Sequence, residues 1–453
     1  MNQHPHQAER LFHEALRRME TGDVSAAESA LRAALAHAPA FAEAHANLGL
    51  LLHRARRAAE AEQAYLLAAT LQPDASRIHL NFGNLLADSG RAAEAEARYR
   101  RALDVDPGGA DAWSALGALL ASSGRTAEAE ACLRQALTLE PAHAGAAFNL
   151  AYVLLREARY AEGWQRLEAR PPMPQPSGLQ AERWRGEALA GRSLLICQDG
   201  GHGDMLHFVR YAALAKSAGA TRVAVLCAPA LVALLAHADG VDEAHAFGDV
   251  FDPAWDWWVP ALSLPGSFGT QAASIPAALP YLAAEAGRMQ RWSGLAREAQ
   301  GRRRVGLVWI GNPRFENDAQ RSLPSIMTLA PLADAADACW FSLQKGAGAD
   351  EAHSMPHGLP LIDLAPGIAD FADLAAVMMH LDLVITVDTA AAHLAGALGK
   401  PCWVLLPAWK TDWRWLENRS DSPWYPGVLR LFRQTVPGEW APVIAAVAKA
   451  LQA

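Results

Sequence analysis

The chain has 453 residues, a formal net charge of -8 and 51% hydrophobic residues. A length of this size predicts about three domains, and the mild negative charge argues against nucleic acid or an anionic membrane as a general partner. No apolar run approaches the ~18 residues of a membrane-spanning helix, and the N-terminus lacks a basic-then-apolar signal pattern. The five scattered cysteines have no CxxC spacing, which indicates reduced core residues, so we expect a cytoplasmic protein.

The first third of the chain repeats itself every 34 residues. A closing proline and a triplet that places a small residue where two helices cross both keep this period. They are Pro39, Pro73, Pro107 and Pro141, and Asn47-Leu48-Gly49, Asn81-Phe82-Gly83, Ala115-Leu116-Gly117 and Asn149-Leu150-Ala151. This pattern resembles the tetratricopeptide repeat, with about four and a half copies over roughly residues 7–168, and predicts an all-α superhelix over residues 1–168.

Superhelices of this kind usually bind peptides or proteins in a concave groove. In the tetratricopeptide arm of O-GlcNAc transferases, asparagines line that groove. The residues that resemble them here are Asn47, Asn81 and Asn149, with Ala115 interrupting the series. We therefore expect a protein or peptide acceptor in the groove, and the alternative is that these asparagines only pack at helix crossings. Because repeat arms often pair, a homodimer is a further expectation.

A proline-rich segment, residues 169–190, predicts a semi-rigid linker. From Gly191 onward, short apolar runs alternate with helical segments, which predicts parallel sheets in two α/β halves, residues 191–300 and 301–436. The expected strands are residues 193–197, 222–227, 257–260, 305–310, 339–343, 384–387 and 402–406. A C-terminal helix, within residues 437–453, ends the chain.

The segment Asp382–Pro401 predicts a strand, an N-capped helix and the start of a second strand. In such a unit the helix N-terminus lies at the carboxyl edge of the sheet with unpaired N–H groups, which suits a phosphate or pyrophosphate. The alternative is an ordinary crossover in which Asp388 only caps its helix.

A glycine-rich loop, residues 198–204, follows the first expected strand and precedes a predicted helix from Met205 to Ala218. Its glycines do not have the GxGxxG spacing, so a dinucleotide fingerprint is not supported. They would let a ligand approach the backbone and would leave Asp204 facing it. The alternative is that Asp204 is the N-cap of the helix.

Two motifs in this order resemble the heptosyltransferase family, glycosyltransferase family 9, which has a GT-B fold of two Rossmann-like halves. They are Gly203-Asp204-Met205-Leu206-His207 and Val387-Asp388-Thr389-Ala390-Ala391-Ala392-His393-Leu394. The resemblance covers roughly residues 191–450. With the repeats included, the whole chain resembles bacterial tetratricopeptide-repeat glycosyltransferases.

The resemblance assigns roles to individual residues. Asp204 corresponds to the general base, and His393 would reach toward the sugar or the diphosphate. Arg321, at a position where lysine is usual, would neutralise the leaving diphosphate. The expected nucleotide-sugar contacts are Gly203, Asp388, Thr389, Ala390, Ala391, Lys345 and Gly346. Ala390 departs from the glycine that is common in the family. The last helix often crosses back to the first half in such folds.

These roles imply an inverting glycosyltransferase that uses a nucleotide-diphospho-sugar and transfers the sugar to a protein acceptor recruited by the repeats. No divalent metal or other cofactor is expected, because Arg321 and the helix dipole can neutralise the leaving group. Two alternatives stay open: a scaffold whose GT-B half is a degenerate binding module, and a transferase for a lipid-linked or polysaccharide acceptor.

An aromatic cluster near the C-terminus allows two interpretations. It comprises Trp409, Trp413, Trp415, Trp424 and Tyr425. These rings either stack on a base or a sugar, or form core or interface packing, which is the more usual role of such a cluster.

Overall fold

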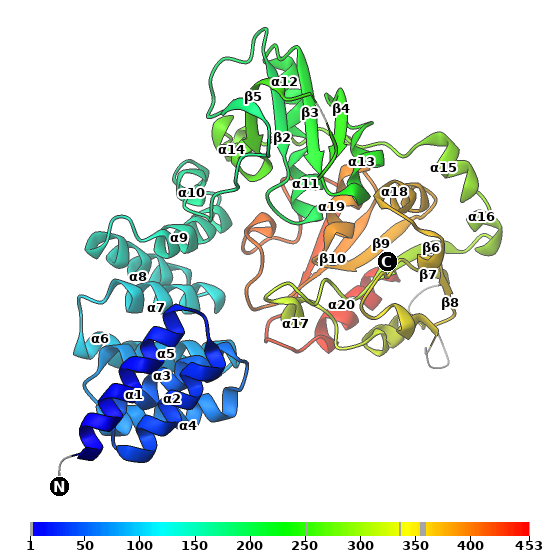
Figure 1. Cartoon of the computed structure of the whole chain (residues 1–453). Helices are drawn as coiled ribbons and strands as arrows, with labels where there is room; N and C mark the ends of the chain where they lie inside the picture. The colour runs from blue at the N-terminus through cyan, green and yellow to red at the C-terminus, as the bar shows by residue number, and fades with distance from the viewer. Residues whose placement is uncertain (1–2, 251, 335–336, 354–358, 453) are drawn as a thin grey trace. The chain divides into compact units, whose positions relative to one another are not determined.

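The computed structural model describes residues 3–250, 252–334, 337–353 and 359–452 (Figure 1). The chain divides into two compact units, Met1–Leu150 and Ala151–Ala453. The division falls inside a helix of the repeat array, so the packing boundary lies earlier than the predicted repeat boundary at residue 168.

The repeat array consists of ten helices that follow one another as five hairpins in the described part of the chain. The helices are α1 (Gln3–Glu20), α2 (Val24–His37), α3 (Ala42–Arg54), α4 (Ala58–Leu71), α5 (Ser76–Asp88), α6 (Ala92–Val105), α7 (Ala110–Ser122), α8 (Thr126–Leu139), α9 (Ala144–Arg156) and α10 (Tyr160–Leu167). The hairpin of α1 and α2 lacks the Asn-Leu-Gly triplet, which is why the sequence period counts only about four and a half copies.

The periodic glycines Gly49, Gly83 and Gly117 are needed for close helix contact inside the three hairpins that contain them. A Cβ atom on Gly83 would lie 2.5 Å from the ring of Tyr99, and one on Gly49 would lie 2.9 Å from the ring of Tyr65. The glycine on the first helix therefore makes room for the large side chain on the second. A second glycine, Gly90, ends α5 in the left-handed region with φ of +75°.

Adjacent repeats are also joined by ion pairs that keep the 34-residue period. The guanidinium of Arg91 lies 2.7 Å from Glu62 in the preceding repeat and 2.6 Å from Glu94 in its own. Arg57 and Arg125 repeat this arrangement. Because these arginine side chains are 39% exposed, we expect the pairs to fix the stacking register more than to add stability.

The first sheet contains five parallel strands in the order β1-β5-β2-β3-β4. They are β1 (Gln180–Arg183), β2 (Ser193–Cys197), β3 (Arg222–Cys227), β4 (Glu243–Ala246) and β5 (Ala254–Pro260). The strand order reverses between β2 and β5, and in open parallel sheets ligands bind beyond the carboxyl ends of the strands at such a point.

Two details of this half differ from the sequence prediction. β1 comes from the predicted linker and forms the edge of the sheet by pairing with β5. The helix predicted over residues 205–218 is two helices, α11 (His202–Phe208) and α12 (Tyr211–Ser217). The break has a local cause, because the side-chain Nε of Arg210 donates to the carbonyl of His207. In a continuous helix that carbonyl would accept from the N–H of Tyr211.

The second sheet contains six parallel strands in the order β11-β10-β9-β6-β7-β8. They are β6 (Arg303–Val308), β7 (Ala338–Ser342), β8 (Leu361–Asp363), β9 (Leu383–Val387), β10 (Cys402–Leu406) and β11 (Leu429–Arg433). Here the order reverses between β9 and β6. The chain therefore has an all-α repeat region followed by an α/β region with two parallel sheets, as predicted.

The remaining helices cover or connect these sheets. They are α13 (Pro229–Leu235), α14 (Leu264–Ser267), α15 (Ala286–Arg291), α16 (Leu295–Glu298), α17 (Asp318–Arg321), α18 (Phe371–Met379), α19 (Ala390–Ala397) and α20 (Ala441–Leu451). Six short 3₁₀ turns occur in the described ranges: η1 (Ala261–Ser263), η2 (Ala272–Ser274), η3 (Ile326–Leu332), η4 (Ala349–His353), η5 (Ala365–Gly367) and η6 (Trp413–Trp415). The last helix packs its Val443, Ile444 and Val447 into the core of the second sheet, rather than onto the first half as the resemblance suggested.

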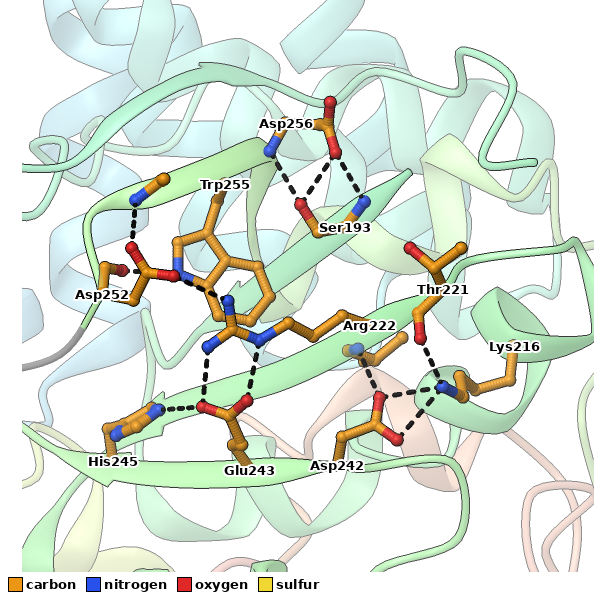
Figure 2. A network of polar contacts seen from close by, with 12 residues as sticks. Ser193, Lys216, Thr221, Arg222, Asp242, Glu243, His245, Asp252, Trp255 and Asp256 are labelled. Carbon is orange, nitrogen blue, oxygen red and sulfur yellow. Dashed lines mark hydrogen bonds and ion pairs between the residues drawn. The ribbon is translucent and has the colours of Figure 1, made fainter. Parts of the chain in front are cut away.

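A polar network closes the amino edge of the first sheet, opposite the carboxyl edge (Figure 2). Asp256 accepts hydrogen bonds from the N–H and the hydroxyl of Ser193, both at 2.8 Å, and pairs with Arg192. Arg222 pairs with Glu243 and Asp252, and its guanidinium lies 4.1 Å from the ring centre of Trp255. These contacts join the starts of four strands.

The hydrogen bonds from Ser193 and Arg192 lower the pKa of Asp256 to about 2. A lowered pKa in the folded state gives stability that is present above the unfolded value and is lost as the pH falls toward 2. We therefore expect Asp256→Asn to lower the midpoint of thermal unfolding at pH 7. The difference from the wild type should shrink steadily between pH 5 and pH 3, as followed by circular dichroism. The control is Asp239→Asn, an exposed residue of the same half that lies outside the network. A pH-independent difference for Asp256→Asn would contradict this account.

Candidate active site

The two α/β halves meet where α11 and α19 begin. A Cβ atom on Gly203 would lie 2.9 Å from Cδ2 of His393 and 3.4 Å from Cα of Ala390, so only glycine allows this approach. α11 follows β2 and α19 follows β9, and both strands flank the point where their sheet reverses its order. Figure 1 shows α11 and α19 between the two sheets. The structure thus brings the two sequence motifs together at the positions where parallel sheets bind ligands.

Asp204 lies in the first turn of α11. The helix begins one turn earlier than predicted, and its N-cap is Gly201 rather than Asp204. One carboxylate oxygen, Oδ2, accepts from the N–H of Gly201 at 2.7 Å, and the other, Oδ1, accepts from the guanidinium of Arg414. Burial raises the pKa of Asp204, and the positive charge of Arg414 acts against this rise.

Arg414 belongs to the η6 turn of the second half, and the sequence analysis did not identify it. Its side chain is 5% exposed, and its Nη1 donates to both carboxylate oxygens of Asp412, at 3.1 and 3.0 Å. The guanidinium also lies 4.4 Å from the ring centre of Trp413 and 5.1 Å from that of Phe208. The only sequence signal was an arginine two residues after an acid, Asp412, inside the aromatic cluster.

Asp388 follows the last residue of β9 but does not cap α19. The N-cap is Thr389, whose Oγ1 accepts from the N–H of Ala391 at 3.3 Å. Burial and the nearby charge of Asp412 raise the pKa of Asp388 to about 6, while Arg321 and Arg414 act against that rise. An ionised Asp388 would repel a phosphate, so the groups that suit an anion here are the amides of Ala390 and Ala391, the N-terminus of α19 and Arg321.

His393 is a buried, packed side chain in this structure. Its Nδ1 lies 2.9 Å from the hydroxyl of Tyr425, which also lies 2.8 Å from Nδ1 of His207. Burial and the nearby arginines lower the pKa of both histidines well below the usual value. A hydroxyl has one hydrogen to donate, so at least one of the two imidazoles carries its own hydrogen on Nδ1. The ring of His393 also stacks on Trp415, with 5.2 Å between ring centroids.

Arg321 is the last residue of α17, in the segment that follows β6. Its side chain is 15% exposed, donates to Asp318 at 3.1 Å and lies 4.3 Å from the ring centre of Phe315. A Cβ atom on Gly311 would lie 2.9 Å from its Nη2. These contacts hold the guanidinium near β6, the strand beside β9. Arg321 is therefore not a freely solvated loop residue.

Lys345 and Gly346 are not part of this group of residues. They follow β7, and β6 lies between β7 and β9. Along the same sheet edge they are therefore roughly 10 Å from the end of β9. Both are exposed, and the Nζ of Lys345 donates to the carbonyl of Ile368. Nearby, Glu351 accepts from the indole N–H of Trp309 and the backbone N–H of Ile326, which gives it a structural role.

Most of the predicted aromatic cluster is core. Trp413, Trp415, Trp424 and Tyr425 are fully buried. Trp413 and Trp424 pack against Trp164 of α10, with 5.2 Å between the ring centroids of Trp164 and Trp413. Trp409 is the one member that is partly exposed.

The repeat unit has a groove of about 1060 Å³ lined by asparagines. Asn81 and Asn149 line it as predicted, together with Asn84 and the buried Ser114. Asn47 does not belong to this lining, and its side-chain amide donates to the carbonyl of Glu43 at 2.8 Å. The groove therefore presents amide and hydroxyl groups of the kind that hold an extended peptide backbone.

Comparison with known families agrees with this organisation. Residues 12–76, 86–136 and 115–174 match the tetratricopeptide repeat, and residues 334–405 match glycosyltransferase family 9 (heptosyltransferase). The chain combines tetratricopeptide repeats with a family 9 glycosyltransferase domain. The matched part of that domain contains Asp388 and His393 but neither Asp204 nor Arg321.

One curated relative is protein FlbA of Caulobacter vibrioides, which is 26% identical over 318 residues. That match spans 65% of this chain and 52% of FlbA, or about half the length of the relative.

Two solved structures are similar to the repeats. PilF of Pseudomonas aeruginosa has 23% identity and a TM-score of 0.35, over 37% of this chain and 76% of that chain. The tetratricopeptide protein TTC0263 of Thermus thermophilus has 21% identity and a TM-score of 0.33, over 36% of this chain and 92% of that chain. In the part of the chain that the structure describes, no helix is both long and apolar enough to cross a membrane.

The contact between Gly203 and His393 gives a stability prediction. We expect Gly203→Ala to lower the free energy of unfolding by about 1–3 kcal/mol, because the added methyl group would force α11 away from α19. The control is Gly294→Ala, since a Cβ atom there would have no neighbour within 4 Å and its φ of -65° suits alanine. Urea unfolding of both variants measures the difference. Equal stability of the two variants would contradict the close approach.

Proposed function

We propose that the protein is an inverting glycosyltransferase that takes a sugar from a nucleotide-diphospho-sugar and transfers it to a protein acceptor. The observation that carries this proposal is the close approach of Gly203, the residue before Asp204, to Ala390 and His393 at the start of α19, with each helix at the reversal point of its own sheet. The proposed base from one half would thereby lie near the proposed anion-binding helix end of the other. The match to family 9 over residues 334–405 supports the same reaction class.

In this proposal Asp204 takes the proton from the acceptor hydroxyl. The oxygen then attacks the anomeric carbon from the face opposite the leaving diphosphate, so one bond forms as the other breaks and the configuration inverts. The first turn of α11, which carries Asp204, packs against the start of α19 through Gly203.

The leaving diphosphate takes up negative charge as the glycosidic bond breaks. The amides of Ala390 and Ala391, the hydroxyl of Thr389 and the positive end of the α19 dipole would stabilise that charge. Arg321 would add a guanidinium fork suited to phosphate oxygens. With these groups present, the proposed reaction uses no divalent metal or other cofactor. His393 would contact the sugar or the diphosphate, and Lys345 and Gly346 would serve a more distant part of the nucleotide.

The repeats would recruit the acceptor in the cytoplasm. The groove lined by Asn81, Asn84 and Asn149 supports an extended peptide as its occupant, since side-chain amides can both donate to and accept from a peptide backbone. A non-catalytic scaffold is the outcome that the first experiment below would reveal instead. A transferase for a lipid-linked or polysaccharide acceptor is the alternative that differs from this proposal in its acceptor.

The first experiment is a thermal-shift screen against UDP, GDP, ADP, CMP and their sugars, with and without magnesium. A ligand at 100 times its dissociation constant stabilises the folded state by about 2.7 kcal/mol, which raises the unfolding temperature measurably. We expect one nucleotide to act selectively and equally in magnesium and in a chelator. No shift with any compound would favour the scaffold.

The second experiment replaces the proposed base. We expect Asp204→Asn to reduce sugar transfer by at least about 100-fold, the usual contribution of a general base, while the nucleotide shift is unchanged. Asp421→Asn, which removes a surface ion pair with Arg419, serves as the control and should retain activity. Transfer at the wild-type rate by Asp204→Asn would remove this residue from the mechanism.

A further inference from the structure

Both oxygens of the Asp204 carboxylate are engaged in this structure, and one of the partners comes from the other half of the α/β region. The N–H of Gly201 is local, since it belongs to the turn that starts α11. Arg414 is 210 residues away in sequence and reaches across from the second half. The base is therefore oriented by a residue that no sequence motif connects with it.

Arg414 is itself held by several independent contacts. Asp412 accepts from both its backbone N–H and its guanidinium, and the rings of Trp413 and Phe208 lie against the guanidinium. At the same time its buried Nε has no acceptor among the described residues. A buried charge with an unused donor is costly to maintain, which indicates a purpose other than stability.

The turn that carries Arg414 is attached to the last helical hairpin of the repeat array. Nη2 of Arg156, at the end of α9, donates to the carbonyl of Thr411 at 3.0 Å, and Arg156 also lies 3.6 Å from Glu417. Trp164 of α10 packs against Trp413, the neighbour of Arg414. The turn that carries the Arg414 guanidinium is thus held by contacts with residues before and after Arg414 in the sequence.

We propose, on the basis of the proposed function, that Arg414 is a positioning residue that holds the carboxylate of Asp204 in its orientation and keeps it ionised for proton removal. The other charged or titratable groups that face Asp204 are Asp412 of the same turn, Asp199 of the loop after β2 and Tyr152 of α9. The two acids oppose ionisation of Asp204, as burial does, so Arg414 supplies the main compensating charge.

The first test measures the pairing itself without using activity. Thermal unfolding of the full chain is compared for Asp204→Asn, Arg414→Gln and the double variant. We expect Arg414→Gln to lower the unfolding temperature, because it leaves the partly buried Asp204 carboxylate without its positively charged partner. The decrease in unfolding temperature of the double variant should be smaller than the sum of the decreases of the two single variants. Strictly additive losses would overturn the proposal, and this result stands even if no donor or acceptor is found.

The second test uses the pH dependence of transfer. Without Arg414 the carboxylate of Asp204 holds its proton more tightly, so the acid limb of the kcat/KM profile should move to higher pH by at least one unit. At a pH on that limb the loss is then at least tenfold and recovers as the pH rises. In Arg414→Lys the acid limb of the kcat/KM profile should stay at the wild-type pH. The control is Arg419→Gln, which replaces a surface arginine of the next segment.

Two outcomes of the second test would overturn the proposal. One is a uniform loss with an unmoved acid limb, which would assign Arg414 a purely structural role. The other is loss of the nucleotide thermal shift in Arg414→Gln, which would make Arg414 a donor-binding residue. A wild-type protein without transfer activity would count against the proposed function alone, since the unfolding cycle still reports on the pair.

Discussion

The close contact of α11 with α19 is the constraint on which the rest of the α/β region depends. It requires a glycine at position 203, and it places His207 and His393 on either side of one hydroxyl, that of Tyr425. Gly396 is needed for the same reason, since a Cβ atom there would lie 2.4 Å from the Tyr425 ring. Small residues on both helices thus allow one buried tyrosine to connect the two halves.

Buried polar groups then fix the relative orientation of these halves more specifically than apolar packing would. Arg210, which is 3% exposed, donates to the carbonyls of His207 and Trp424 and to the hydroxyl of Tyr281. The bond to Trp424 joins the two halves, and its loss would leave buried groups unsatisfied if the halves slid past one another, at a cost of roughly 1–3 kcal/mol per group. The same arginine interrupts the helix after Phe208, so one side chain sets both the local backbone and the long-range contact.

The sequence predicted those parts of the structure that follow from local periodicity. The strands at 193–197, 222–227 and 402–406 have the predicted bounds, and the all-α and α/β regions are confirmed. β1, β4, β8 and β11 were missed because they are short or partly exposed and have weak apolar patterns. Arg414 could not be predicted, because its significance depends on a partner 210 residues away that only the assembled fold brings near. In our proposal the role of Asp204 as the base depends on Arg414.

The repeat period and the packing boundary are different properties of this chain. By sequence period, α9 and α10 are the last repeat, yet α10 and the end of α9 pack with the α/β region and contact the turn that carries Arg414. A hairpin shared in this way cannot move independently of that turn. In our proposal Arg414 orients Asp204. A displacement of the last hairpin would therefore move the turn through Arg156 or Trp164, and the turn would move the Asp204 carboxylate through Arg414.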